Sequence, residues 1–317
     1  MDSTSRRGKT FVWRFGLCCA AVIVLLSFAS ATENGASVFP VGVETVMTGL
    51  QPHPGQTMFY EYTCFYEANE TDNSKGQKEP IDFKLRVFAT AIKVSHTWDF
   101  KLFGGNFNTN IAIPIIFQEL HVPPGKFTKY AIGNVDLVPF GVNYHKGIAH
   151  WYYEADVFFP GTAYSQKDVL NIGQHNLAIG PVVGFTLLPH KGQTEISSRT
   201  TFLVNGPDND TKYHSGNEFF SEFNVDQEIT KKVALGVNGA FYQQVTDDHF
   251  NGAIFGDGYR GRDLQIGPQV RVNIPHGGFA FKYYRDTLVE NKPRGNAFWF
   301  QIAVPFAGLS KPHEPGH

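Results

Sequence analysis

The feature that most constrains this chain is a strict alternation of apolar and polar residues, seen most clearly in "RDLQIGPQVRVNIP" at residues 262–275. Alternate side chains of a β-strand point to opposite faces, so this stretch has one apolar face and one polar face. The apolar face carries Leu264, Ile266, Val270, Val272 and Ile274, and the polar face carries Asp263, Gln265, Gln269, Arg271 and Asn273. Such a strand separates a protein core from water, or lipid from a wet lumen.

The same two-residue period recurs in about twelve segments between residues 57 and 306. Tight links such as "HKG" (145–147) and "PHGG" (275–278) alternate with long polar links such as "NGPDNDTKYHSG" (205–216). Short periplasmic turns and longer outer loops are typical of bacterial outer-membrane barrels. We therefore predict an all-β fold, an antiparallel transmembrane β-barrel of about 12 strands over residues 56–306. A soluble exported β-sandwich is the weaker alternative.

The N-terminus predicts export. Basic residues at 6, 7, 9 and 14 precede the apolar run "FGLCCAAVIVLLSF" (15–28), and Ala29 and Ala31 occupy the small-residue positions of a cleavage site. The run is shorter than the ~20 residues that a spanning helix needs. We assign residues 1–31 to a signal peptide, which predicts export. Together with the predicted barrel, this places the chain in the outer membrane. We then expect the barrel-assembly machinery to insert it and outer-membrane lipid to contact its surface. Residues 307–317 form a C-terminal tail beyond the last strand.

Charge and cysteine content exclude other classes of protein. Residues 1–31 hold four of the 27 Lys+Arg and one of the 29 Asp+Glu, so 23 basic and 28 acidic residues remain, and no nucleic acid partner is predicted. Cys64 is then the only cysteine, which excludes an intrachain disulfide. Residues 32–55 precede the first strand and are rich in Gly and Pro. They either fold into the lumen as a plug or form a loose tail.

A barrel of twelve strands lies between the filled eight-stranded kind and the open sixteen-stranded kind, so a narrow or plugged pore is expected. Inward charges tune selectivity or form ion pairs that brace the wall. Inward aromatic rings offer stacking surfaces to an apolar solute. The predicted lumen residues are Phe59, Glu61, Arg86, Tyr152, Glu154, Asp156, Arg199, Glu222, Tyr242, Gln244, Arg271 and Trp299.

No catalytic constellation is predicted. His214 and Ser215 are adjacent, and neighbours on a strand point to opposite faces, so they do not make a nucleophile and base pair there. Between residues 53 and 276 no two histidines stand two or four positions apart, so no metal site is predicted. No cofactor is predicted either.

Several motifs resemble the MetA-pathway of phenol degradation family. They are "ENGASVFPVG" with "GLQPHPG" at the start, "DLVPFGVNY" with "VFFPGTAY" in the middle, and "TKYHSGNEFFSEF", "LGVNGAFYQQVTDD" and "GRDLQIGPQV" near the end. The resemblance covers nearly all of the chain after residue 31. It carries over as family-motif positions Thr211, Tyr213, Ser215, Gly216, Tyr242, Gln244, Asp247 and Asp248. His53 between the opening prolines and the tail after Phe306 depart from the family pattern.

The resemblance implies an outer-membrane barrel that passes small hydrophobic or aromatic compounds inward by diffusion, in connection with aromatic catabolism. Two alternatives remain open at this point. One is an outer-membrane hydrolase, which requires an inward Ser and His on one face. The other is a closed barrel that serves as a receptor or structural element of the envelope.

Overall fold

Residues 37–165 and 167–306 are described by the structure, a computed structural model. The predicted signal peptide (1–31) and the C-terminal tail (307–317) lie outside these residues. Twelve long strands of the described chain form the wall. They are β1 (Thr57–Thr71), β2 (Lys84–Leu102), β3 (Gly105–Val122), β5 (Val135–Lys146), β6 (Ala149–Phe159), β7 (Ala178–Leu187), β8 (Thr194–Asn205), β10 (Glu218–Glu228), β11 (Val233–Gln244), β14 (Arg262–Ile274), β15 (Gly277–Glu290) and β16 (Pro293–Pro305).

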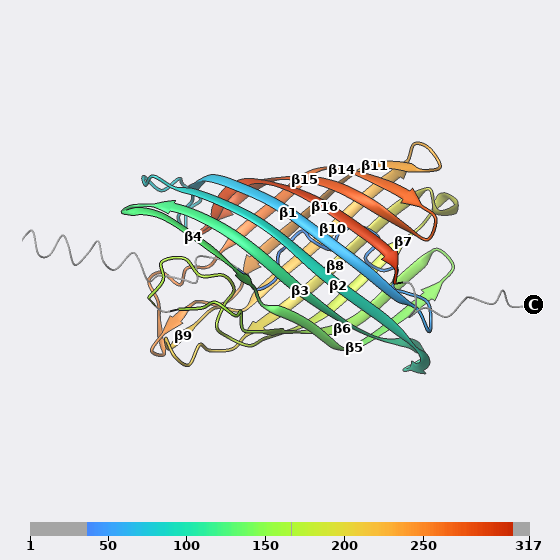
Figure 1. Cartoon of the computed structure of the whole chain (residues 1–317), viewed down its shortest axis with the longest axis horizontal. Helices are drawn as coiled ribbons and strands as arrows, with labels where there is room; N and C mark the ends of the chain where they lie inside the picture. Colours follow the sequence, from blue (N-terminus) through green and yellow to red (C-terminus); the bar gives the residue numbers. More distant parts are fainter. Residues whose placement is uncertain (1–36, 166, 307–317) are drawn as a thin grey trace, which may run out of the picture.

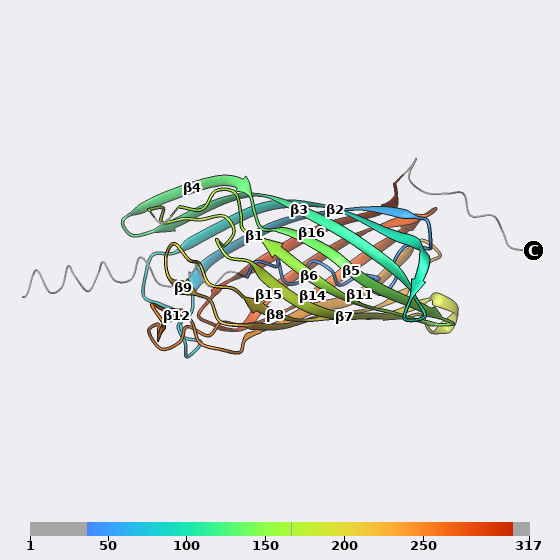
Figure 2. The same ribbon diagram turned by 90° about the horizontal axis from the view of Figure 1, so that it is seen from below.

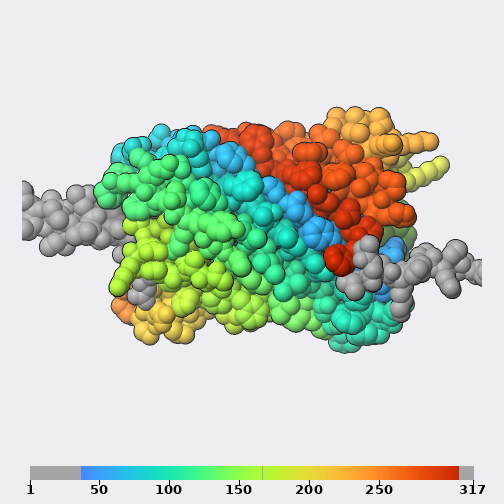
Figure 3. Space-filling view, viewed as in Figure 1, coloured from blue at the N-terminus to red at the C-terminus, as the bar shows by residue number. Residues whose placement is uncertain are grey.

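These strands close into one antiparallel ring. Each pairs with its neighbour along the chain, and β1 pairs with β16 from Met58–Pro305 to Thr71–Pro293. Figure 1 and Figure 2 show the tilted strands surrounding a central space, and in Figure 3 β1 and β2 run diagonally beside β16. The predicted antiparallel barrel of about 12 strands is confirmed.

The two ends of the barrel differ, as the link lengths predict. At one end, called here the short-turn end, the links are 103–104, 147–148, 188–193 (with the 3-10 turn η1, His190–Gly192), 229–232 and 275–276. At the opposite, long-loop end the links are 72–83, 160–177, 206–217 and 245–261, together with the tight turn 291–292. The short strands β9 (Tyr213–His214), β12 (His249–Phe250) and β13 (Ala253–Ile254) lie in the long links.

Strand β3 is longer than the wall needs. Its first half pairs with β5, from Asn106 to Ala112, and its second half pairs with β4 (Gly125–Ile132) as a hairpin. Link 160–177 is attached to this hairpin, because Thr162 N donates to the Ile132 carbonyl oxygen at 3.1 Å. In the described residues no helix is long and apolar enough to cross a membrane.

The alternation of β14 separates the two faces as predicted. Asp263, Gln269 and Arg271 are buried toward the lumen, whereas Ile266 is 41% exposed on the outer surface. An apolar surface on the outside and polar side chains inside are the pattern of a barrel that meets lipid.

The predicted inward orientation is wrong for Phe59, Glu61 and Arg86. Tyr62 and Cys64 belong to the buried cluster and Tyr60 packs against it, so the residues between them on β1 point outward. Phe59 pairs with Val94, Glu61 pairs with Ile92, and Arg86 is exposed. Both faces of β1 carry aromatic residues, so polarity gave no reliable phase there. The apolar residues of β2 change from Leu85 and Val87 to Ile92 and Val94, on the opposite face, which would suggest a bulge near Ala91. Pairing runs without interruption there, so β2 has no bulge at that point.

A charge on the outer wall tests this assignment of faces. Val237 is 48% exposed in the middle of β11, between Val225 and Pro268 of the neighbouring strands. We expect Val237→Arg to lower the free energy of unfolding in lipid by about 2 to 4 kcal/mol, since a cation near mid-bilayer is poorly solvated. Urea titration followed by tryptophan fluorescence measures the change. Ser74→Arg, at the exposed tip of link 72–83, should leave the midpoint unchanged; equal effects of the two variants would contradict the assignment.

Candidate functional site

The lumen is occupied by the chain that precedes β1. Residues 37–56 run from the long-loop end, where the Phe39 ring lies against Phe158, to the short-turn end, where the rings of His53 and His145 are 6.0 Å apart. The blue trace inside the barrel in Figure 1 and Figure 2 follows this path. Residues 37–56 are called the lumen segment below. That the segment closes the pore stays a prediction.

An apolar layer surrounds the part of the lumen segment that lies toward the long-loop end. The Phe39 ring stacks on Phe220 with 4.9 Å between centroids and 11° between planes. The guanidinium carbon of Arg199 lies 4.4 Å from the centroid of the Phe39 ring, so the two side chains make a cation–π contact. The rest of this buried layer consists of Val38, Val43, Tyr62, Cys64, Phe158, Ala178, Leu203, Tyr242, Tyr284, Ala297 and Trp299. Barrel interiors are usually polar, so this layer is unusual.

A charged layer follows toward the short-turn end. Glu44 of the lumen segment pairs with Lys93 at 2.5 Å and with Arg199 at 3.4 Å. Arg199 also pairs with Asp156, and it lies 3.9 Å from Glu154 and 3.8 Å from Glu222. Buried charges are stable only when they are paired and hydrogen-bonded. Glu44 therefore connects cations from two opposite parts of the wall.

The backbone of the lumen segment is held by side chains of the wall. Gly42 N donates to Glu222 at 2.7 Å, and Lys282 Nζ donates to the carbonyl oxygens of Gly42 and Val43 at 3.0 and 2.7 Å. Gly42 has φ +97°, and a Cβ there would lie 2.9 Å from Gln265 Oε1. Because L side chains rarely adopt this φ, glycine is required at the point where the segment contacts the wall.

Further down, Met47 N donates to Glu195 at 2.5 Å, and Gly49 N donates to the Thr186 hydroxyl at 2.9 Å. The acceptor Glu195 is itself paired with Arg271, which also binds Asp226 at 2.8 Å. The wall thus supplies both donors and acceptors to the backbone of residues 42–49.

Nine of the twelve predicted lumen residues face the lumen; they are Tyr152, Glu154, Asp156, Arg199, Glu222, Tyr242, Gln244, Arg271 and Trp299. Whether a solute touches them stays a prediction. Of the residues that hold the lumen segment, Lys282 is expected from the sequence as an inward cation, whereas Phe39, Glu44, Lys93 and Glu195 are not. Lys93 was detectable as a single cation within the apolar stretch "ATAIKV", whereas Glu44 lies in a segment without any periodicity.

Six of the eight family-motif residues lie in links 206–217 and 245–261, and Tyr242 and Gln244 lie at the end of β11 beside them. Asp248 connects several of these residues. Its carboxylate accepts hydrogen bonds from the Tyr213 hydroxyl, from Gly216 N at 2.7 Å and from Gln244 Nε2 at 2.7 Å. Burial raises the pKa of Asp248, although these donors oppose the shift. Folding therefore penalises its ionised form, and the penalty falls as the pH decreases toward that pKa. Asp248 joins link 206–217 to link 245–261.

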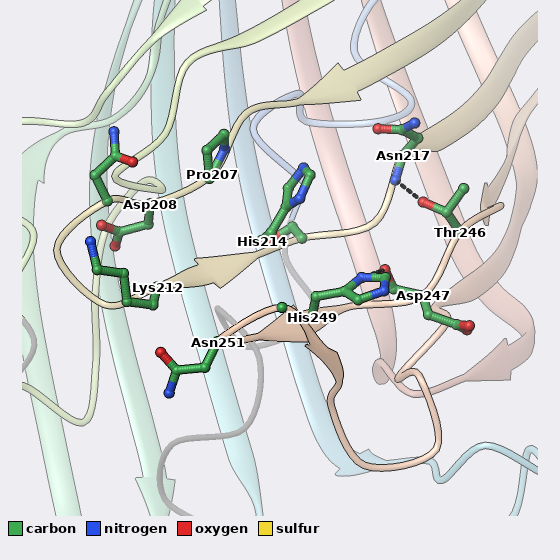
Figure 4. Close-up of a pocket in the computed structure, with 12 residues that line it drawn as sticks. Pro207, Asp208, Lys212, His214, Asn217, Thr246, Asp247, His249 and Asn251 are labelled. Carbon is green, nitrogen blue, oxygen red and sulfur yellow. Dashed lines mark hydrogen bonds between the residues drawn. The ribbon is translucent and has the colours of Figure 1, made fainter.

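A cavity of about 580 Å³ opens between these two links, and Figure 4 shows the side chains that line it, most of which belong to polar residues. His214 of β9 lies opposite His249 of β12, and both contribute to the lining together with Ser215 and Asp247. Arg260 donates a hydrogen bond to Asp247 and holds the pKa of that carboxyl below its usual range. His214 Nε2 lies 2.7 Å from the Asn205 carbonyl oxygen, so this nitrogen is not free to act as a base for Ser215.

Comparison with known proteins agrees with this architecture. Residues 68–302 match the family described as "Putative MetA-pathway of phenol degradation". A COG4313 outer membrane channel from Pseudomonas putida F1 superposes with a TM-score of 0.69 at 12% identity, over 80% of this chain and 97% of that chain. The β domain of the Bordetella autotransporter BrkA aligns with a TM-score of 0.49 at 9% identity, over 79% of this chain and 100% of that chain. A Pseudomonas aeruginosa FadL homologue aligns with a TM-score of 0.38 at 9% identity, over 83% of this chain and 96% of that chain. No curated protein matches the chain.

The Asp248 junction is expected to order both long links. Asp248→Ala leaves the donors of Tyr213, Gly216 and Gln244 unsatisfied, at about 1 to 3 kcal/mol for each buried donor. We expect amide hydrogen exchange in residues 206–217 and 245–261 to accelerate, while the strands stay protected. Asp257→Ala is the matched control, because Asp257 is exposed and, among the described residues, accepts a hydrogen bond from Tyr259 N alone. Unchanged exchange in Asp248→Ala would contradict the role of this junction.

The charged layer is expected to anchor the lumen segment. Glu44→Gln leaves the buried Lys93 without its carboxylate partner, and breaking such a pair costs about 3 to 5 kcal/mol. Hydrogen exchange of residues 37–51 should accelerate in this variant. Gln51→Ala, which removes one bond to the Thr48 carbonyl oxygen, should change exchange only locally. If protection of residues 37–51 is the same in Glu44→Gln and in the unmodified protein, the ion pair does not anchor the segment.

Proposed function

The chain belongs to the MetA-pathway of phenol degradation family, and from that premise we propose that it is an outer-membrane channel for passive uptake of small hydrophobic or aromatic compounds. In this proposal the long-loop end faces the cell exterior, since outer-membrane barrels carry their longer loops outside. The lumen segment is the plug of the channel. The barrel contacts outer-membrane lipid on its apolar surface.

The position of Phe39 carries the proposal. The wall of the barrel holds this single aromatic ring in contact with both Phe220 and the Arg199 guanidinium, inside an apolar layer close to the long-loop end. Stacking and cation–π contacts act equally on any ring of this size and do not require a peptide backbone. A one-ring aromatic solute would therefore make the same contacts when the lumen segment moves away.

The charged layer lies on the short-turn side of the Phe39 ring and supports a gated passage. The contacts of residues 42–49 with Glu222, Lys282 and Glu195 cross the centre of the barrel, so the segment must shift before a solute can pass. The same contacts favour a second candidate, a barrel that stays closed and serves as a receptor or a structural element. The two candidates differ in whether current flows.

Binding of an aromatic solute at the position of the Phe39 ring is tested with Phe39→Ala. Loss of the ring leaves an apolar cavity, and such cavities bind benzene-sized molecules. We expect phenol to raise the melting temperature of the Phe39→Ala barrel more than that of the unmodified barrel, with glycerol causing no shift. Val41→Ala is the matched control in the same segment, because Val41 is only partly buried against the apolar layer.

Passage is tested by planar-bilayer conductance of the refolded chain with and without residues 32–55, while phenol or benzoate is titrated in. Current that increases on deletion and is blocked reversibly by the aromatic solute supports a plugged aromatic channel. Silence in both forms rejects the channel and leaves the closed barrel.

A further inference from the structure

Links 160–177 and 206–217 bring together three side chains that lie far apart in the sequence. His175 Nδ1 is 3.3 Å from Asp208 Oδ1 and 3.7 Å from Asp210 Oδ2, and the three donor atoms lie within 4.8 Å of one another. Ligands that share one metal ion at about 2.1 Å stand on the order of 3.0 to 3.5 Å apart. The two distances from His175 are close to that range, and the two carboxylate oxygens are no more than 4.8 Å apart.

Asp208 is built into the chain as a rigid ligand. It is 1% exposed, and its Oδ1 accepts from Asp210 N at 2.8 Å and Thr211 N at 3.3 Å. Its Oδ2 is buried and has no hydrogen-bond partner among the described residues. A buried carboxylate oxygen without a partner is costly. A cation that binds both oxygens of the Asp208 carboxylate would remove that cost.

The other two groups complete the arrangement. The His175 ring stacks on Tyr164, with centroids 5.0 Å apart and planes 11° apart, and this contact fixes its orientation. Asp210 is exposed and free to turn toward a bound ion. Within the described ranges, His175 is the only ion-pairing partner of either carboxylate. A cavity of about 580 Å³ lined by His175 and Asp210 adjoins the cluster and gives water access to it.

We propose that His175, Asp208 and Asp210 form a binding site for a divalent transition metal ion such as Zn²⁺, which cross-links links 160–177 and 206–217 at the long-loop end. One imidazole and two carboxylates suit Zn²⁺ or Mn²⁺, whereas Ca²⁺ and Mg²⁺ are bound by oxygen ligands alone. Water fills the remaining coordination positions. This proposal does not depend on the proposed channel activity. Metal binding is measured without any solute, so its result is separate from the result of the conductance experiment.

The experiment is calorimetric titration of Zn²⁺ into the refolded, metal-free barrel in detergent, together with its melting temperature and the visible spectrum of the Co²⁺ form. One saturable site, a higher melting temperature and Co²⁺ absorption bands are expected. Both His175→Ala and Asp210→Asn should abolish these signals. Asp210→Asn keeps the size of an exposed side chain, so it tests the site without disturbing the fold.

Control variants separate this site from other histidines. His190→Ala, on the short-turn end, should bind Zn²⁺ as the unmodified barrel does. The other pair to be tested is His145 and His150, whose Nδ1 atoms lie 2.8 Å apart. Zn²⁺ binding that persists in His175→Ala and disappears in His145→Ala would assign the metal to that pair and overturn the proposal. Absence of saturable binding in the unmodified barrel would overturn it as well.

Discussion

The structure depends on one requirement, that every backbone N–H and C=O of the wall must find a partner where no water is present. A strand edge facing lipid would leave a row of these groups unpaired, so the sheet has to close. The pairing of β1 with β16 meets the requirement over thirteen residue pairs. Alternation of side chains then assigns each residue to lipid or to the lumen, and the loops and the lumen segment are built on that frame.

Closure creates an interior that has to be filled. Twelve strands enclose more space than their own inward side chains occupy, and the lumen segment takes up the remainder in two layers. Phe39 fills the apolar layer, and Glu44 neutralises the cations of the charged layer. The same segment therefore meets two different physical needs, apolar packing near the long-loop end and charge compensation below it. A solute that replaces only the ring would leave the charge pairs intact.

The fold could be predicted because alternation and link lengths are local patterns, as β14 and the link "HKG" show. Prediction was wrong where a strand has two similar faces: β1 carries Tyr60 and Tyr62 inward, with Phe59 and Glu61 on the opposite face. Contacts made only by tertiary structure could not be read from sequence at all. Glu44 lies 155 positions from Arg199, and His175 lies 33 positions from Asp208, with no shared periodicity to connect them.

The direction of the lumen segment constrains how the molecule is assembled. Phe39 lies near the long-loop end and Thr57 begins β1 at the short-turn end, so the chain passes through the barrel once before its first strand turns back. Its partners Lys93, Glu222 and Lys282 come from the beginning, the middle and the end of the strand order. These contacts reach their final form only when the ring is complete. The interior therefore reaches its final packing only in a barrel whose β1–β16 seam is paired, so the lumen segment and the seam depend on each other in the finished molecule.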